Sequence, residues 1–126
     1  MLSSSEVCAC LAVKDMVAAA KFYEETLGLT ADKVTPGGTF YKSGNGGVFV
    51  YPSPQYAGTN QATAAAWSVD DVPAEVEALK AKGVSFEQYD GIPGVTRDGD
   101  IHIMGESKSA WFKDPDGNIL NLVSGM

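Results

Sequence analysis

The sequence predicts an α+β fold in which two paired β-α-β-β-β modules form a curved mixed sheet with a concave cup. One observation is that the order of strand and helix patterns in residues 5–51 returns in residues 62–124. A second is that only turn-forming residues lie between them, at 52–61. A third is that neither half could cover its own sheet, so the halves must pair within one chain or between two. We therefore expect a single domain over residues 1–126.

Module 1 opens with a short apolar run at 7–13, whose small and β-branched side chains predict a buried strand. Asp15 is the predicted N-cap of an amphipathic helix, and Gly28 is expected to end that helix in the left-handed conformation. Three strands follow, over residues 29–35, 39–43 and 47–51, joined by glycine-rich turns at 36–38 and 44–46.

Module 2 repeats this order after the linker. Residues 62–69 predict a strand, Asp71 caps the second helix, and Gly83 ends it. Further strands are expected over residues 84–89, 101–105, 109–113 and 119–123. The turn Asp-Pro-Asp-Gly-Asn at 114–118 joins the last two strands, and we expect its two aspartates to face solvent.

Composition excludes several partners. The chain of 126 residues has 16 acidic and 9 basic side chains, a net charge of −7, and no basic run that could bind nucleic acid or an anionic membrane. No segment approaches the roughly 20 apolar residues of a membrane span, and the N-terminus lacks the basic start of a signal peptide. Cys8 and Cys10 lie two residues apart on one strand face, which disfavours a disulfide. Reduced thiols in the cytoplasm, as small wall or core residues, are expected rather than a redox or metal site.

Three motifs carry a resemblance to a known family. They are Val-Lys-Asp at 13–15, Trp-Ser-Val-Asp-Asp-Val at 67–72 and Phe-Lys-Asp-Pro-Asp-Gly-Asn-Ile at 112–119. In this order and spacing they resemble the vicinal oxygen chelate superfamily of glyoxalase I, extradiol dioxygenases, epimerases, fosfomycin-inactivating enzymes and bleomycin-resistance proteins. The resemblance implies the glyoxalase/bleomycin-resistance fold and a homodimer. It also implies either one divalent metal in the cup or, as in the bleomycin-resistance proteins, ligand binding without chemistry.

The resemblance also places four metal ligands, mostly His, Glu or Gln in the family, on the first and last strands of each module. The matching positions here are Cys8, Val50 or a neighbour, Ala64 and Asn121. Alanine and valine offer no lone pair, and one thiolate with one amide oxygen is a poor set for a divalent ion. Moving each position by one residue recovers no carboxylate or imidazole. We therefore expect no metal and no other cofactor.

His102 is the only histidine, on a strand whose alternation places Asp100 and Met104 on the same face. Two interpretations stay open. One is an imidazole in the cup that acts as a base or contacts a ligand. The other, which we favour because no partner is apparent, is a rim or surface histidine.

We assign Phe112 and Trp67 to the core. Trp111 is next to Phe112 on the same predicted strand and so points to the other face, where we expect it to form an aromatic platform in the cup. The proposed ligand-binding residues around it are Cys8, Cys10, Val50, Ala64, Ala66, His102 and Asn121. The small side chains among them leave room for a flat molecule.

These observations predict a metal-free protein that binds and sequesters a flat or cationic organic molecule. The net charge of −7 would attract a cation at long range. One alternative is a metal-dependent lyase, isomerase or dioxygenase with a non-standard ligand set that includes Cys8, Asn121 or His102. Another is a metal-free catalyst that works from His102. No catalytic residue can be assigned from the sequence.

Overall fold

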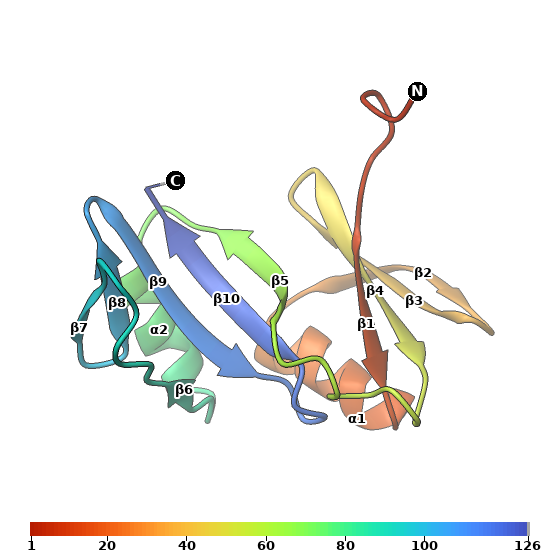
Figure 1. Cartoon of the computed structure of the whole chain (residues 1–126). Helices are drawn as coiled ribbons and strands as arrows, with labels where there is room; N and C mark the ends of the chain where they lie inside the picture. The colour runs from red at the N-terminus through yellow and green to blue at the C-terminus, as the bar shows by residue number, and fades with distance from the viewer. Residues whose placement is uncertain (126) are drawn as a thin grey trace. The chain divides into compact units, whose positions relative to one another are not determined.

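The computed structural model describes residues 1–125 and has the predicted α+β class, with one sheet for each module (Figure 1). The chain divides into two compact units. The first contains residues 1–64 together with the turn at 114–118, and the second contains residues 65–113 and the last strand. The turn that closes module 2 in the sequence thus belongs to the first unit in space.

The first unit contains a four-stranded mixed sheet in the order β1-β4-β3-β2. Its elements are β1 (Ala9–Val13), α1 (Met16–Ala20), the π-helix η1 (Lys21–Thr26), β2 (Thr30–Thr35), β3 (Gly38–Ser43) and β4 (Gly46–Pro52). Strand β1 is parallel to β4, whereas the β4–β3 and β3–β2 pairs are antiparallel.

The second sheet has six strands, with the path β5-β10-β9-β8-β7 and with β6 also paired to β9. Its elements are β5 (Thr63–Ser68), α2 (Val72–Lys80), β6 (Phe86–Glu87), β7 (Thr96–Asp98), β8 (Ile101–Met104), β9 (Ser107–Lys113) and β10 (Ile119–Ser124). Strand β5 runs beside β10 in the same direction (Figure 1).

The helix starts and stops are confirmed. The carboxylate of Asp15 accepts a 2.8 Å hydrogen bond from the N–H of Val17, and that of Asp71 accepts one of 3.0 Å from Ala74. Gly28 has φ +75° in the left-handed conformation that ends a helix.

The prediction was wrong about three details of secondary structure. The predicted helix after Asp15 widens into a π-helix, in which the N–H of Leu27 donates to the carbonyl of Phe22 five residues earlier. The predicted strand at 84–89 shrinks to Phe86–Glu87. Strand β7 was not predicted, because it is only three residues long and follows a turn rich in glycine.

Each sheet buries the face that contacts its helix. In the first unit the core contains Leu11, Val13, Tyr41, Val48 and Val50 of the sheet and Ala19 and Tyr23 of the helical segment. In the second it contains Ala110, Phe112, Leu120 and Leu122 of the sheet and Val72, Val76 and Leu79 of α2. Phe112 is thus a core residue, as predicted, whereas Trp67 is only half-buried.

Asp114 does not face solvent, and that prediction was wrong. Only 5% of the residue is exposed, and its carboxylate accepts hydrogen bonds from the hydroxyl of Tyr23 (2.7 Å) and the side-chain amide of Asn118 (2.8 Å). The backbone N–H groups of Asp116 and Asn118 donate to its other oxygen. The Asn118 amide also donates to the carbonyl of Ala12 on β1. The turn therefore joins the first unit through a buried carboxylate.

The phenol of Tyr23 is the donor in this network. Burial, followed by the adjacent carboxylate of Asp114, raises the pKa of the Tyr23 phenol well above its ordinary value. The ring itself is fully buried and packs 6.0 Å from Tyr41.

Asp114→Ala would remove the acceptor of four hydrogen bonds and leave the buried hydroxyl of Tyr23 and amide of Asn118 with fewer partners. We expect the free energy of unfolding, measured by urea denaturation, to fall by about 2–4 kcal/mol. Asp116→Ala is the matched control. Asp116 is only half-buried and accepts one 3.3 Å bond from Lys14, so its loss should stay below about 1 kcal/mol. Equal losses for the two variants would contradict the assigned role of Asp114.

Candidate functional site

The register of β9 and β10 separates two faces of the second sheet. Trp111 pairs with Asn121, and Phe112 pairs with Leu120. The two side chains of a cross-strand pair share a face, and successive pairs alternate. Since Phe112 and Leu120 belong to the core with α2, Trp111 lies on the opposite side. We call this side, defined by Trp111, Asn121, Ser109, His102 and Glu87, the α2-distal face.

Three rings meet on this face and are called here the aromatic cluster: Tyr89, His102 and Trp111. The ring centres of His102 and Trp111 are 4.9 Å apart, with planes at 87°. Tyr89 lies 5.5 Å from Trp111, also edge to face, and 5.8 Å from His102. Such edge-to-face contacts are favourable arrangements of aromatic rings. Trp111 itself is half-buried.

His102 is buried, with 2% of its surface exposed. The interpretation as a rim or surface histidine was therefore wrong, because the backbone of Tyr89 and the ring of Trp111 lie against it. Its Nε2 accepts a 2.9 Å hydrogen bond from the N–H of Tyr89. Within residues 1–125, Nδ1 is buried and has no hydrogen-bond partner.

Asn121 is also buried on the α2-distal face, with 6% exposed. Its side-chain amide donates to the carbonyl of Ala110 at 3.2 Å, so its nitrogen is committed to the sheet. The side-chain oxygen can act only as a hydrogen-bond acceptor.

In the first unit the register separates two of the predicted residues. Cys10 pairs with Phe49, and Leu11 pairs with Val50, so Cys10 and Val50 lie on opposite faces of the sheet. Val50 is fully buried in the core. Phe49 therefore occupies the place beside Cys10 that counting from the motifs had given to Val50. Its ring lies 6.0 Å from that of Tyr51 with planes at 13°.

The two cysteines are free thiols and both are exposed. Burial and then the neighbouring Cys8 raise the pKa of the Cys10 thiol, so that thiol stays protonated near neutral pH. In β5, Ala64 and Ala66 alternate with the buried Ala65. They therefore point away from the side on which Ala65 is buried.

The candidate residues fall in both units. Those in the first are Cys8, Cys10, Val50 and Ala64, and those in the second are Ala66, His102, Trp111 and Asn121. The structure brings His102 and Trp111 into contact and places Asn121 on their face. Tyr89 and Phe49 were missed, because neither the loop before β7 nor the register of β4 is visible in the sequence.

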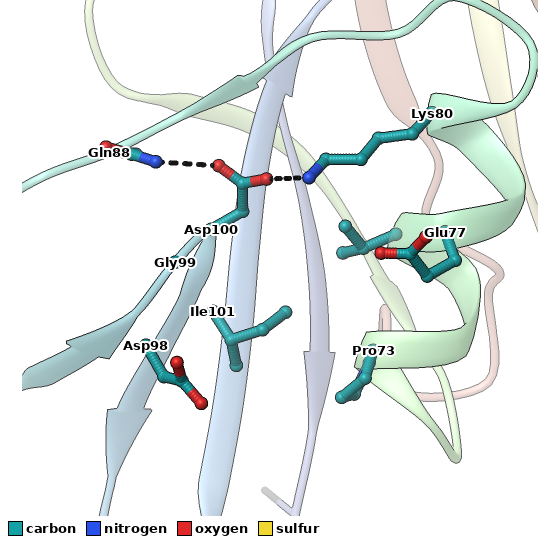
Figure 2. Close-up of a pocket in the computed structure, with 9 residues that line it drawn as sticks. Pro73, Glu77, Lys80, Gln88, Asp98, Gly99, Asp100 and Ile101 are labelled. Atoms are coloured by element: carbon teal, nitrogen blue, oxygen red, sulfur yellow. Dashed lines mark hydrogen bonds and ion pairs between the residues drawn. The ribbon is translucent and has the colours of Figure 1, made fainter.

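A separate hollow of about 340 Å³ lies between α2 and the β7–β8 hairpin. Figure 2 shows Lys80 reaching across it to Asp100, at 2.5 Å, while Gln88 donates to the other oxygen of the same carboxylate at 3.1 Å. The lysine, and then the glutamine, lower the pKa of Asp100. Lys80 and Asp100 in the hollow thus neutralise each other. Ile101 lines the hollow, so the next residue of the strand, His102, points to the opposite face of the sheet.

A second ion pair organises the segment from 88 to 100. The guanidinium of Arg97 donates to both oxygens of Asp90, at 2.9 and 3.1 Å, and to the carbonyl of Gly99 at 2.8 Å. This pair lowers the pKa of the Asp90 carboxyl. The side chain of Arg97 therefore holds together the loop that follows Tyr89 of the aromatic cluster.

The donor set does not fit the metal that the family resemblance implies. The four matched positions supply one thiol, two aliphatic side chains and one amide whose nitrogen is already bonded. Across the described residues, 1–125, no group of three or more His, Cys, Asp or Glu side chains could hold a metal ion. Hard and borderline divalent ions require more oxygen or nitrogen donors than this.

None of the helices in residues 1–125 is long and apolar enough to cross a membrane.

Comparison with known proteins identifies a family. Residues 7–122 match the family described as the Glyoxalase/Bleomycin resistance protein/Dioxygenase superfamily. No curated protein matches the chain significantly in sequence.

Solved structures share the fold at low sequence identity. A bleomycin resistance determinant encoded on transposon Tn5 is 21% identical, with TM-score 0.73 and coverage of 97% of this chain and 98% of that one. The fosfomycin resistance protein FosX of Listeria monocytogenes is 18% identical, with TM-score 0.73 and coverage of 98% and 94%. Lactoylglutathione lyase of Agrobacterium tumefaciens is 22% identical, with TM-score 0.69 and coverage of 97% and 94%.

Acid should loosen the segment from 88 to 100 before the rest of the second unit. The pKa values of Asp90 and Asp100 are depressed in the folded state, so their contribution is complete at neutral pH. It is lost as the pH falls below about 4, through those depressed values. Amide exchange protection of this segment, read by NMR, should fall accordingly.

Asp90→Asn should cause the same loss of protection at neutral pH, whereas Asp98→Asn, which changes an exposed carboxylate of the same segment, should not. Unchanged protection in Asp90→Asn would show that the Arg97 pair does not hold the segment.

Proposed function

Since the chain belongs to the glyoxalase/bleomycin resistance protein/dioxygenase superfamily, we propose that it is a metal-free protein that binds a flat organic molecule. The ligand would lie on the α2-distal face against Trp111. The observation that carries this proposal is the aromatic cluster, because it presents a half-buried indole braced by two further rings.

The composition of this face suits ligand binding. Pockets for small molecules are mostly apolar and aromatic, with a few polar groups that fix orientation. Trp111 and Tyr89 provide aromatic area, and the side-chain oxygen of Asn121 and the imidazole of His102 provide polar groups. The rings hold one another edge to face, so little conformational entropy would be lost on binding.

The predicted residues of the first unit and of β5 stay proposed as ligand-binding residues of their own sheets. We propose that Cys8, Cys10, Ala64 and Ala66 leave space for a ligand beside them, since all are small. Phe49 would take the place that we first gave to Val50, because it shares the face of Cys10.

The choice of binding over metal chemistry rests on this chain's own donors. The names of structurally similar proteins include resistance determinants as well as a lyase, so they do not decide between the two. The four positions discussed above lack the carboxylates and imidazoles that a catalytic divalent ion requires.

We further propose that the protein is a homodimer in the cytoplasm. Two free, exposed thiols favour a reducing compartment. The homodimer follows from the family resemblance. A net charge of −7 would attract a planar cation at long range and repel a planar anion.

The test is calorimetric titration, with and without EDTA, of bleomycin, fosfomycin and the planar cation acridine orange. We expect a planar ligand to bind whether or not EDTA is present. Trp111→Ala should raise its dissociation constant about tenfold or more, because the largest stacking surface is lost. Trp111→Phe should lie between the two.

Tyr56→Ala is the control, since it removes an aromatic side chain that is 63% exposed in the chain segment that follows β4 and precedes β5. It should bind like the unmodified chain. Equal affinity of Trp111→Ala and Tyr56→Ala, or binding that EDTA abolishes, would refute the proposal.

A further inference from the structure

His102 carries a buried polar atom that the described chain does not satisfy. Its side chain is 2% exposed, and its Nδ1 is buried without a hydrogen-bond partner among residues 1–125. Buried polar atoms without a partner are rare because each one costs the free energy of its lost hydration. Nδ1 has no exposed surface of its own, so a ligand that moves part of the cover formed by Tyr89 and Trp111 would supply the missing hydrogen bond.

The hydrogen bond on the other side of the ring identifies this atom as a donor. Nε2 accepts the N–H of Tyr89 at 2.9 Å, so Nε2 carries a lone pair and no proton. A neutral imidazole then carries its proton on Nδ1. If Nε2 carried a proton, its N–H and the backbone N–H of Tyr89 would both be donors and could not form the observed hydrogen bond. The missing partner is therefore a hydrogen-bond acceptor.

The charged groups around the ring indicate that this acceptor is uncharged. Asp90 is paired with Arg97, Asp100 with Lys80, and Glu87 with Lys113 at 3.5 Å. Each of these basic side chains already has a carboxylate partner, and Asp98 on β7 adds a further, exposed carboxylate beside the same strand. An anionic ligand would have to compete with these carboxylates and would meet a chain with a net charge of −7.

We propose that Nδ1–H of His102 donates to a carbonyl oxygen of a planar ligand whose ring system packs on Trp111. The ligand class is thus an aromatic amide, lactam or ketone, neutral or cationic elsewhere. The indole of Trp111, with its plane at 87° to the imidazole, would take the apolar ring. This inference rests on the proposed function and adds the polar contact that orients the ligand.

The tautomer can be tested without any ligand. The chain has a single histidine, so the ¹⁵N-labelled protein gives one imidazole spin system. Long-range ¹H–¹⁵N correlation at neutral pH should show a protonated Nδ1 and an unprotonated Nε2. An Nε2–H tautomer or an imidazolium ion would overturn the inference.

The acceptor can be tested with 1-indanone and indane, which differ by one carbonyl group in the same fused ring. Both should shift the indole N–H signal of Trp111 in NMR titrations. Only 1-indanone should shift the Nδ1–H signal of His102, and it should bind about three- to tenfold more tightly than indane.

Two variants separate the two nitrogens. His102→Gln keeps an acceptor near the position of Nε2 for Tyr89 and removes the donor at Nδ1, so it should fold but bind both compounds equally. His102→Asn keeps an amide donor near the position of Nδ1, so it should retain a preference for 1-indanone.

The outcomes distinguish this inference from the proposed function. Equal affinity of the unmodified chain for the two compounds, with Trp111 shifted by both, would overturn the role of His102 and leave the aromatic platform standing. A Trp111 signal that neither compound moves would overturn the proposed binding face as well.

Discussion

The cross-strand register of β9 and β10 is the constraint on which the candidate site depends. It commits Phe112 and Leu120 to the core beneath α2, and each such side chain contributes about 1.5–3 kcal/mol on burial. A slip of one residue would exchange them for Trp111 and Asn121, and would bury an amide where an aliphatic side chain now packs. The core therefore locks the register, and the register obliges Trp111 to face away from α2. Because β8 pairs with β9, His102 is brought to the same face.

Much of this arrangement is visible in the sequence because it depends on local rules. The N-cap residues Asp15 and Asp71, the glycine stops and the parity of Trp111 against Phe112 each follow from spacing within one element. The duplication of the module adds the order of the strands. These features required no knowledge of which residues meet across the chain.

The errors at Asp114, Val50 and His102 share one cause, which is that the deciding partner lies elsewhere in the sequence. The local pattern predicts a solvent-facing turn aspartate at Asp114, but the hydroxyl of Tyr23, 91 residues away, donates to its carboxylate. Val50 matched a ligand position by counting, but its pairing with Leu11 places it in the core. No partner for His102 could be predicted, because its Nε2 accepts a hydrogen bond from a backbone N–H, that of Tyr89, and any residue type could provide this group. Pairing and burial of this kind are settled by tertiary packing and not by local pattern.

The central claim is that this member of the family works without a metal, and a thermal melt tests it most directly. The melting midpoint should be the same in EDTA and with Zn²⁺, Ni²⁺, Mn²⁺ or Fe²⁺ added, since the four matched positions lack the carboxylate and imidazole donors that these ions prefer. An ion that bound only the folded chain at 100 times its dissociation constant would add about 2.7 kcal/mol and raise the midpoint by several degrees. A rise of that size with one ion, reversed by EDTA, would contradict the account.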